Sequence, residues 1–310
     1  MFAPAKIQAV LNQTTTPQQQ RLAYGALAIT STIWGSTWVV SKLGVQHTHG
    51  LHVSFIRQFI AGSIFLLYFL VFKKEKLPTK QQFAWLFMMS VIMFVFANAI
   101  STWSIQYIPS GLGALIGALY PLSVAIIQML FLKYKPSWLT MTGLLLGFAG
   151  VGFVLYENAF HQQPKGYVLG VLLALFAMLS WSVGTILLSR NKFQINPYYA
   201  TGWQMVMSSV MVACIAYGTG VTQPFNSIAV NTWWAIAYLV TAGSVLTFVA
   251  FIYSLKHLHP TVASLYAYIN PLVAIGIGNL VLQEPFTTPI IIGTIITLVG
   301  VFLVNKSMKQ

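Results

Sequence analysis

Ten apolar stretches of about 20 residues fill most of the sequence and constrain its fold more than any other feature. They run over 22–44, 52–72, 83–105, 110–132, 138–156, 167–189, 199–219, 231–254, 260–282 and 287–305. A helix of about 20 residues spans the hydrocarbon core of a bilayer and pairs its own backbone groups there. Only 6% of the residues are charged, whereas a soluble domain has about 25%. The sequence therefore predicts an all-α membrane protein with ten transmembrane helices.

The second feature is an internal repeat. Residues 108–151 align without a gap on residues 258–301, at a constant offset of 150. Identical pairs in this alignment include Pro121 with Pro271, Gly143 with Gly293 and Gly150 with Gly300. Farther out, Trp34 meets Trp181 and Arg57 meets Gln204 at an offset of 147. Because each half has an odd number of stretches, the second copy starts on the opposite side of the membrane. We therefore expect two inverted five-helix repeats, 22–156 and 167–305, joined by the extracytoplasmic connector 157–166.

Basic residues are spread unevenly over the connecting segments. With the N-terminus placed inside, thirteen lysines and arginines fall on inner segments, and only Lys42 and Lys165 fall on outer segments. Cytoplasmic loops carry such an excess. The segments 1–21 and 306–310 are therefore expected in the cytoplasm, with the protein in the bacterial inner membrane. This placement accounts for most of the net charge of +13 without nucleic acid as a partner. The expected partners are the bilayer and a small-molecule substrate, with the chain acting as a monomer or homodimer.

These features together resemble the EamA family of the drug/metabolite transporter superfamily. The resemblance covers residues 22–305 and includes the run from Trp34 to Trp38, Arg57, the paired prolines, and Glu284 followed by Gly293 and Gly300. It implies a carrier of small metabolites, often an exporter of amino acids or related solutes. It also implies a cavity lined by the first four helices of each half, with the fifth and tenth helices at the periphery. Lys256 lies at a helix end rather than inside a helix, which disfavours phosphorylated substrates.

Polar and aromatic residues inside the apolar stretches are the candidate cavity residues, because a polar tip in a membrane needs a hydrogen-bond partner. The candidates are Trp34, Trp38, Arg57, Asn98, Tyr120, Trp181, Trp203, Gln204, Tyr266, Tyr268 and Asn270, with Ser101 on the same argument. Trp34 and Trp181 fit a pocket wall and helix packing equally well. Pro121 and Pro271 each remove a backbone donor in mid-helix, so they are either paired hinges or fixed kinks.

Arg57 is the one charge embedded in an apolar stretch. Three roles are open to it: holding a substrate carboxylate, pairing with Glu284 as an outer latch, or serving as a permanent ion pair or interfacial anchor. Glu284 precedes a helix start and could instead interact with the positive end of that helix dipole. The other acids, Glu75 and Glu157, lie in loops, and no aspartate is present.

No feature of the sequence predicts an enzyme. The histidines at 47, 49 and 52 have no cysteine or carboxylate nearby, so we expect no metal, and no cofactor motif or catalytic dyad is found. The predicted function is export of small metabolites, amino acids or related compounds, by alternating access around a midplane cavity. The alternative is an exporter of drugs or other apolar or aromatic solutes. A non-transporting sensor or enzyme would need a catalytic or metal constellation that the sequence lacks.

Overall fold

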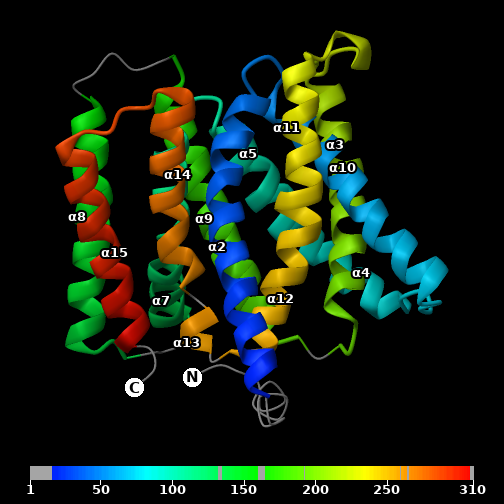
Figure 1. The fold of residues 1–310 in the computed structure, drawn as a ribbon, viewed down its shortest axis with the longest axis horizontal. Coiled ribbons are helices and arrows are strands. Elements are labelled where there is room, and N and C mark those ends of the chain that lie inside the picture. The colour runs from blue at the N-terminus through cyan, green and yellow to red at the C-terminus, as the bar shows by residue number, and fades with distance from the viewer. Residues whose placement is uncertain are drawn as a thin grey trace.

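The computed structural model describes residues 16–131, 135–159, 165–191, 193–258, 260–263 and 265–307, and all regular structure in these ranges is helical (Figure 1). Lys6, Lys133, Lys192 and Lys309 of the charge count lie outside the described residues, as do parts of the predicted terminal segments and of the connector.

The first half contains α2 (Pro17–Gly44), α3 (Gly50–Leu67) with the π-helical turn η1 (Tyr68–Phe72), α4 (Lys80–Met89), η2 (Ser90–Ala99), α5 (Ile100–Ser104), α6 (Ser110–Gly117), α7 (Tyr120–Phe131) and α8 (Trp138–Ala159). The second half contains α9 (Tyr167–Ser189), α10 (Pro197–Gly218), the single turn η3 (Phe225–Ser227), α11 (Val230–Val240), η4 (Thr241–Leu246), α12 (Thr247–His257), α13 (Pro260–Ala263), α14 (Tyr266–Leu282) and α15 (Thr288–Ser307).

Each predicted apolar stretch coincides with one helix or with consecutive helices. Eight of these helical units are long and apolar enough to cross a membrane. The unit around α14 is apolar but shorter, at 17 residues, whereas α2 has 28 residues and is not among the eight. The protein is therefore a multi-pass helical membrane protein. In Figure 1, α2 begins and α15 ends at the same end of the bundle.

Polar caps fix where several helices start. Thr16 accepts a hydrogen bond from the Gln19 backbone nitrogen while the Gln19 side chain accepts from the Thr16 nitrogen. Thr79 and Gln82 form the same capping box at the start of α4. Such boxes pair two of the backbone donors that a helix start otherwise leaves free.

Helix packing repeats between the halves. The pairs α8 with α15 and α3 with α10 each join repeat-related helices. α2 packs on α12 and α14, and its repeat mate α9 packs on α5 and α7 in the corresponding way. Figure 1 shows α8 and α15 side by side at one edge of the bundle, with α2 near its centre. The π-helical segments η2 and η4 also occupy overlapping positions at the offset of 150.

Glycines bring α8 and α15 into backbone contact. A Cβ on Gly143 would lie 2.7 Å from the Gly300 carbonyl oxygen, and one on Gly150 would lie 2.6 Å from the Gly293 carbonyl oxygen. Conversely, a Cβ on Gly300 would lie 2.6 Å from the Gly143 carbonyl oxygen, and one on Gly293 would lie 2.8 Å from the Gly150 carbonyl oxygen. Since Gly293 is the repeat mate of Gly143 and Gly300 that of Gly150, the contact is reciprocal, as at a two-fold axis. Small residues allow this close approach in a membrane.

The two repeat-related prolines have different local structures. The helix breaks between α6 and α7, so Pro121 is the second residue of a new helix, where a missing backbone donor costs little. Pro271 lies inside the continuous helix α14. Both prolines are buried, and neither lines the cavity described below. The helix is thus interrupted just before Pro121, whereas α14 continues through Pro271.

Candidate functional site

A cavity of about 210 Å³ lies between the two halves. Its wall is built by α2, α3, η2, α5, α6 and α7 of the first half and by α9, α12 and α14 of the second. None of its lining residues comes from α8 or α15, the peripheral pair, and none comes from α10. The cavity is therefore shared by the halves without being symmetric.

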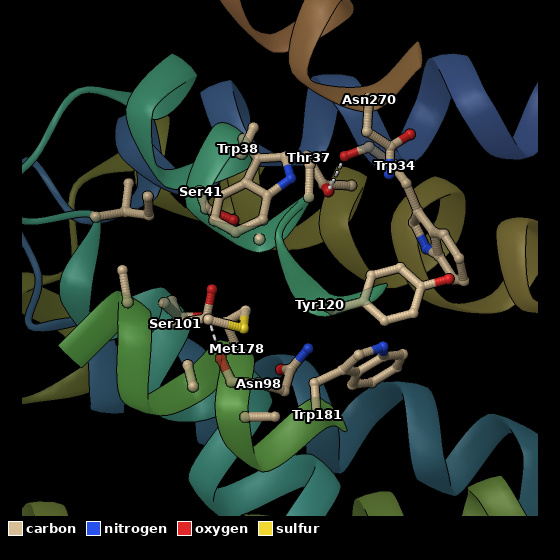
Figure 2. Close-up of a pocket in the computed structure, with 18 of the residues that line it drawn as sticks. Trp34, Thr37, Trp38, Ser41, Asn98, Ser101, Tyr120, Met178, Trp181 and Asn270 are labelled. Carbon is tan, nitrogen blue, oxygen red and sulfur yellow. Dashed lines mark hydrogen bonds between the residues drawn. The ribbon is translucent and has the colours of Figure 1, made fainter. Parts of the chain in front are cut away.

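Nine of the predicted residues share this wall. They are Trp34, Trp38, Arg57, Asn98, Ser101, Tyr120, Trp181, Tyr266 and Asn270. Figure 2 shows Trp38 and Ser41 facing Asn98, Ser101 and Met178 across the cavity, with Trp34, Tyr120 and Trp181 gathered on one side. Side chains from helices far apart in sequence thus converge on one volume.

Trp34 is held rigidly in an aromatic cluster. Its ring centroid lies 5.5 Å from that of Phe248, 4.9 Å from Phe251 and 5.3 Å from Tyr266. Its indole nitrogen donates to the Gly243 carbonyl oxygen at 3.2 Å, within η4. A ring fixed on several sides and by its nitrogen presents a preformed apolar surface to the cavity.

Tyr120 and Tyr266 bring the two halves together on the cavity wall, since Tyr120 belongs to α7 of the first half and Tyr266 to α14 of the second. Tyr266 also packs on a small apolar cluster formed by Ala23, Leu27 and Leu258 with Ala263. This cluster lies toward the end of the bundle where α2 begins, so Tyr266 connects the cavity with the packing at that end.

Two amides on the wall are oriented by neighbouring groups. The side-chain oxygen of Asn98 accepts from Gln58 Nε2 at 3.2 Å, and Gln58 also donates to Ser54 and to the Phe94 carbonyl. In the amide orientation that satisfies its surroundings, Asn270 donates to the backbone carbonyls of Ser31 and Tyr266. Each amide thus has one end fixed by protein groups.

Among the described residues that line the cavity, Arg57 alone has a charged side chain. It is 8% exposed, and its Nε donates to Ser244 Oγ of η4 at 3.1 Å. No carboxylate contacts it among the described residues. The permanent ion pair that the sequence left open is therefore not formed.

The predicted latch between Arg57 and Glu284 is not formed either, which corrects that expectation. Glu284 accepts from the Ser110 nitrogen at 2.7 Å, from Ser110 Oγ at 2.7 Å and from the Gly111 nitrogen at 3.2 Å. Lys42 Nζ donates to the carbonyls of Ile105, Gln106 and Ile108 beside it. The carboxylate thus lies at the positive start of α6 and the ammonium at the negative end of α5, as helix dipoles favour.

Three predicted residues lie outside the cavity, which corrects the expectation that they line it. Trp203 packs on the rings of Phe83 and Tyr199, with its nitrogen buried and unpaired in the described structure. Gln204, beside it on α10, is buried, and its backbone carbonyl accepts a hydrogen bond from Ser90 Oγ. The Tyr268 hydroxyl lies against Asn305 and the Val301 carbonyl of α15. None of the three lines the cavity.

The outer histidines have structural contacts. His49 Nδ1 accepts from the Leu51 nitrogen and caps α3, and His52 Nδ1 accepts from the Gln223 nitrogen. Burial, with His52 nearby, lowers the pKa of His49 below its usual value of 6.5. No cluster of three metal-ligating side chains occurs within the described ranges.

The sequence reading missed several lining residues, among them Thr37, Ser41, Phe94, Met178 and Phe248. Helical spacing could have found some of them. Thr37 lies three residues after Trp34, and Ser41 lies three residues after Trp38, so each shares a helix face with its tryptophan. Met178 lies three residues before Trp181 and extends the same face of α9.

The Trp38 ring rests on glycines of α6. A Cβ on Gly117 would lie 3.1 Å from Trp38 Cζ2 and one on Gly113 3.1 Å from Cζ3, closer than the roughly 3.5–4.0 Å of packed carbon atoms. Glycine at these positions therefore lets the ring lie back from the cavity.

Gly117→Ala is expected to push the Trp38 ring into the cavity and weaken substrate binding. A binding penalty of about 1 kcal/mol raises KM roughly fivefold. The measurement is KM in reconstituted liposomes. Gly276→Ala on α14 is the control, because nothing lies within 4 Å of its added carbon. Equal KM values for the two variants would contradict this account of Trp38.

An apolar helical bundle with a partly polar cavity between its halves is the architecture of a membrane transporter. The EamA-like transporter family model matches residues 21–156 and again residues 168–306, and the chain belongs to this family. Its relatives are transporters rather than enzymes, and the chain is accordingly a transporter and not an enzyme.

Curated relatives cover most of the chain. The uncharacterized inner membrane transporter YedA of Escherichia coli is 29% identical over 83% of this chain and 81% of its own length. The uncharacterized transporter YoaV of Bacillus subtilis is 25% identical over 91% of this chain and 96% of its own. One solved crystal structure is similar at a TM-score of 0.61 with 14% identity, covering 94% of this chain and 98% of that one. That likeness concerns the fold alone.

Proposed function

We propose that the chain exports small metabolites, namely amino acids or related compounds, across a bacterial inner membrane by alternating access. The observation that carries the proposal is the cavity between the halves, with the repeat-related Trp34 and Trp181 both on its wall. A site shared in this way keeps its contacts when either half moves.

The proposed architecture has ten spans in two inverted five-helix repeats, 22–156 and 167–305, with both termini cytoplasmic. Two observations support it: the family model matches twice, and the glycine contact between α8 and α15 is reciprocal. In this arrangement, the Glu284 contact with α6 lies at the extracytoplasmic end. The break before Pro121 and the proline-containing α14 then serve as the two unequal flexing points. The helix is interrupted between α6 and α7, whereas Pro271 removes a backbone donor inside α14 and weakens that helix locally.

A second candidate function is export of drugs or other apolar and aromatic solutes. The aromatic wall around Trp34, Trp38 and Trp181 favours it, together with the single charged side chain on that wall. A panel of labelled amino acids, amino-acid-related acids and uncharged aromatic compounds in reconstituted liposomes distinguishes the two functions. Transport of the uncharged compounds alone would favour the second, and transport of no panel member would contradict both.

Trp181→Ala is expected to raise the KM for aromatic substrates roughly tenfold, because an aromatic contact of about 1.5 kcal/mol is lost. Trp203→Ala is the matched control, since Trp203 lies outside the cavity. It should lower the melting temperature of the purified protein and leave KM at the parent value. If Trp203→Ala raises KM as much as Trp181→Ala does, the cavity is not the transport site.

A further inference from the structure

The charges on the cavity wall restrict the chemical class of ligand that it can bind. The sequence contains three carboxylates, Glu75, Glu157 and Glu284, and none of them lines the cavity. Glu284 is held by Ser110 and Gly111, Glu75 is exposed beside η1, and Glu157 lies near the end of α8. The wall therefore carries the positive charge of Arg57 and no negative charge to balance it.

The guanidinium group has binding capacity left over. Arginine has five N–H donors, and the structure uses the one on Nε, which donates to Ser244 Oγ. The four N–H groups on Nη1 and Nη2 have no acceptor among the described residues. Ser244 holds the side chain from its Nε edge, so the edge formed by Nη1 and Nη2 stays open. That edge matches the two oxygens of a carboxylate.

We infer that this cavity takes a monocarboxylate anion bound by Arg57, with an apolar or aromatic body against the tryptophan wall. The inference rests on the proposed function and narrows its substrate class. A monoanion neutralises the cavity, whereas a zwitterionic amino acid brings an ammonium group that meets no carboxylate there. The compounds related to amino acids that fit this cavity are those that keep the carboxylate but lack the ammonium group, namely 2-oxo acids, 2-hydroxy acids and N-acylated amino acids.

The charge of the ligand also sets the direction of transport. Each cycle that carries a monoanion alone moves one net negative charge, since Arg57 remains with the protein. An inside-negative potential of about 100 mV favours the outer side by about 2.3 kcal/mol for each such charge. That free energy corresponds to roughly 50-fold outward accumulation. The membrane potential therefore suffices to drive export without a coupled ion.

The test uses three aromatic probes of similar shape: phenylpyruvate, phenylalanine and phenylalaninamide. Their charges near neutral pH are negative, zwitterionic and predominantly positive. Purified full-length protein is reconstituted in liposomes, and a potassium diffusion potential with valinomycin sets the voltage. We expect phenylpyruvate to be transported best and to move toward the positive side, with a rate that rises with voltage.

Variants at Arg57 assign the carboxylate contact. Arg57→Gln should weaken phenylpyruvate binding by at least about tenfold and phenylalaninamide binding by less than twofold. Arg57→Lys should recover part of the loss, because it keeps the charge without the planar fork. Arg190→Gln removes an exposed arginine at the end of α9 and should behave as the parent. Quenching of tryptophan fluorescence measures binding, and a melting curve verifies that each variant is folded.

Two results would overturn the inference while leaving the proposed function intact. One is preferred transport of phenylalanine with no response to voltage, which would mean that the aromatic wall holds the ammonium group. The other is an equal loss of all three probes in folded Arg57→Gln, which would make Arg57 a structural residue. Failure of the parent protein to transport any of the wider panel would instead contradict the proposed function itself.

Discussion

Replacing Gly300 with leucine is expected to be the most destabilising change at the helix contacts described above. A Cβ at this position would lie 2.3 Å from the Gly147 nitrogen and 2.6 Å from the Gly143 carbonyl oxygen. Both are backbone atoms, so no rotamer change relieves the overlap and α15 has to move away from α8. Overpacking in a close-packed interior costs about 1–3 kcal/mol, and a backbone overlap belongs at the upper end of that range.

The matched control for Gly300→Leu is Gly152→Leu. Gly152 lies on α8, is exposed, and has no atom within 4 Å of an added Cβ. In detergent, the melting temperature of purified Gly300→Leu should be clearly lower than that of the parent protein, whereas that of the control should change little. Because neither helix lines the cavity, the Gly300 variant that still folds should keep the parent KM. Identical melting temperatures for both variants would rule out the close α8–α15 contact.

Glu284→Ala is expected to have the second largest effect, on access to the cavity. It removes the acceptor for Ser110 and Gly111 at the start of α6. Hydrogen bonds to charged groups contribute about 1.5–3 kcal/mol each, and Ser110 and Gly111, whose donors are left behind, are buried. If one to three kcal/mol of this holds α6 against the segment that carries Glu284, separation of the two becomes roughly 5- to 150-fold more frequent.

Labelling of a cysteine inside the cavity measures this opening. Ser41→Cys, in a Cys214→Ala background, places a thiol on the wall near that end, and a membrane-impermeant maleimide is added to either side of sealed vesicles. Glu284→Ala should speed labelling by at least about fivefold from the side where Glu284 contacts α6, which we propose to be extracytoplasmic. Glu75→Ala, at an exposed glutamate, is the control. Unchanged labelling would mean that Glu284 does not hold this end closed.

The sequence predicted which types of residue line the cavity wall, but it predicted only in part which individual residues do so. Tyr266 and Asn270 are four residues apart on α14 and share a face, and both line the cavity. Tyr268 is two residues from each, about 200° around the helix, and it faces α15 instead. Helical geometry alone therefore separated Tyr268 from its neighbours. Trp203 and Gln204 offered no comparable signal.

The sequence could not separate these residues because a membrane helix is surrounded by apolar lipid rather than by water. In a soluble helix, polar residues mark the outside and hydrophobic residues mark the core. In a membrane helix such as α10, the lipid-facing and protein-facing sides are both apolar, so the sequence carries little information about which face turns inward. Trp203 packs between aromatic rings in the protein interior, but in sequence it looks the same as Trp181.

Arg57 shows the same division between sequence and structure in electrostatic terms. The sequence by itself determined the helical membrane fold, the family and the presence of a single embedded charge, because apolar length and charge count are properties of composition and order. Only the tertiary structure decided which groups interact with the Arg57 guanidinium. Glu284 is drawn to the start of α6 by two backbone nitrogens and a hydroxyl, which leaves Arg57 with Ser244 and a free guanidinium edge. Partners so distant in sequence are set by how the helices pack.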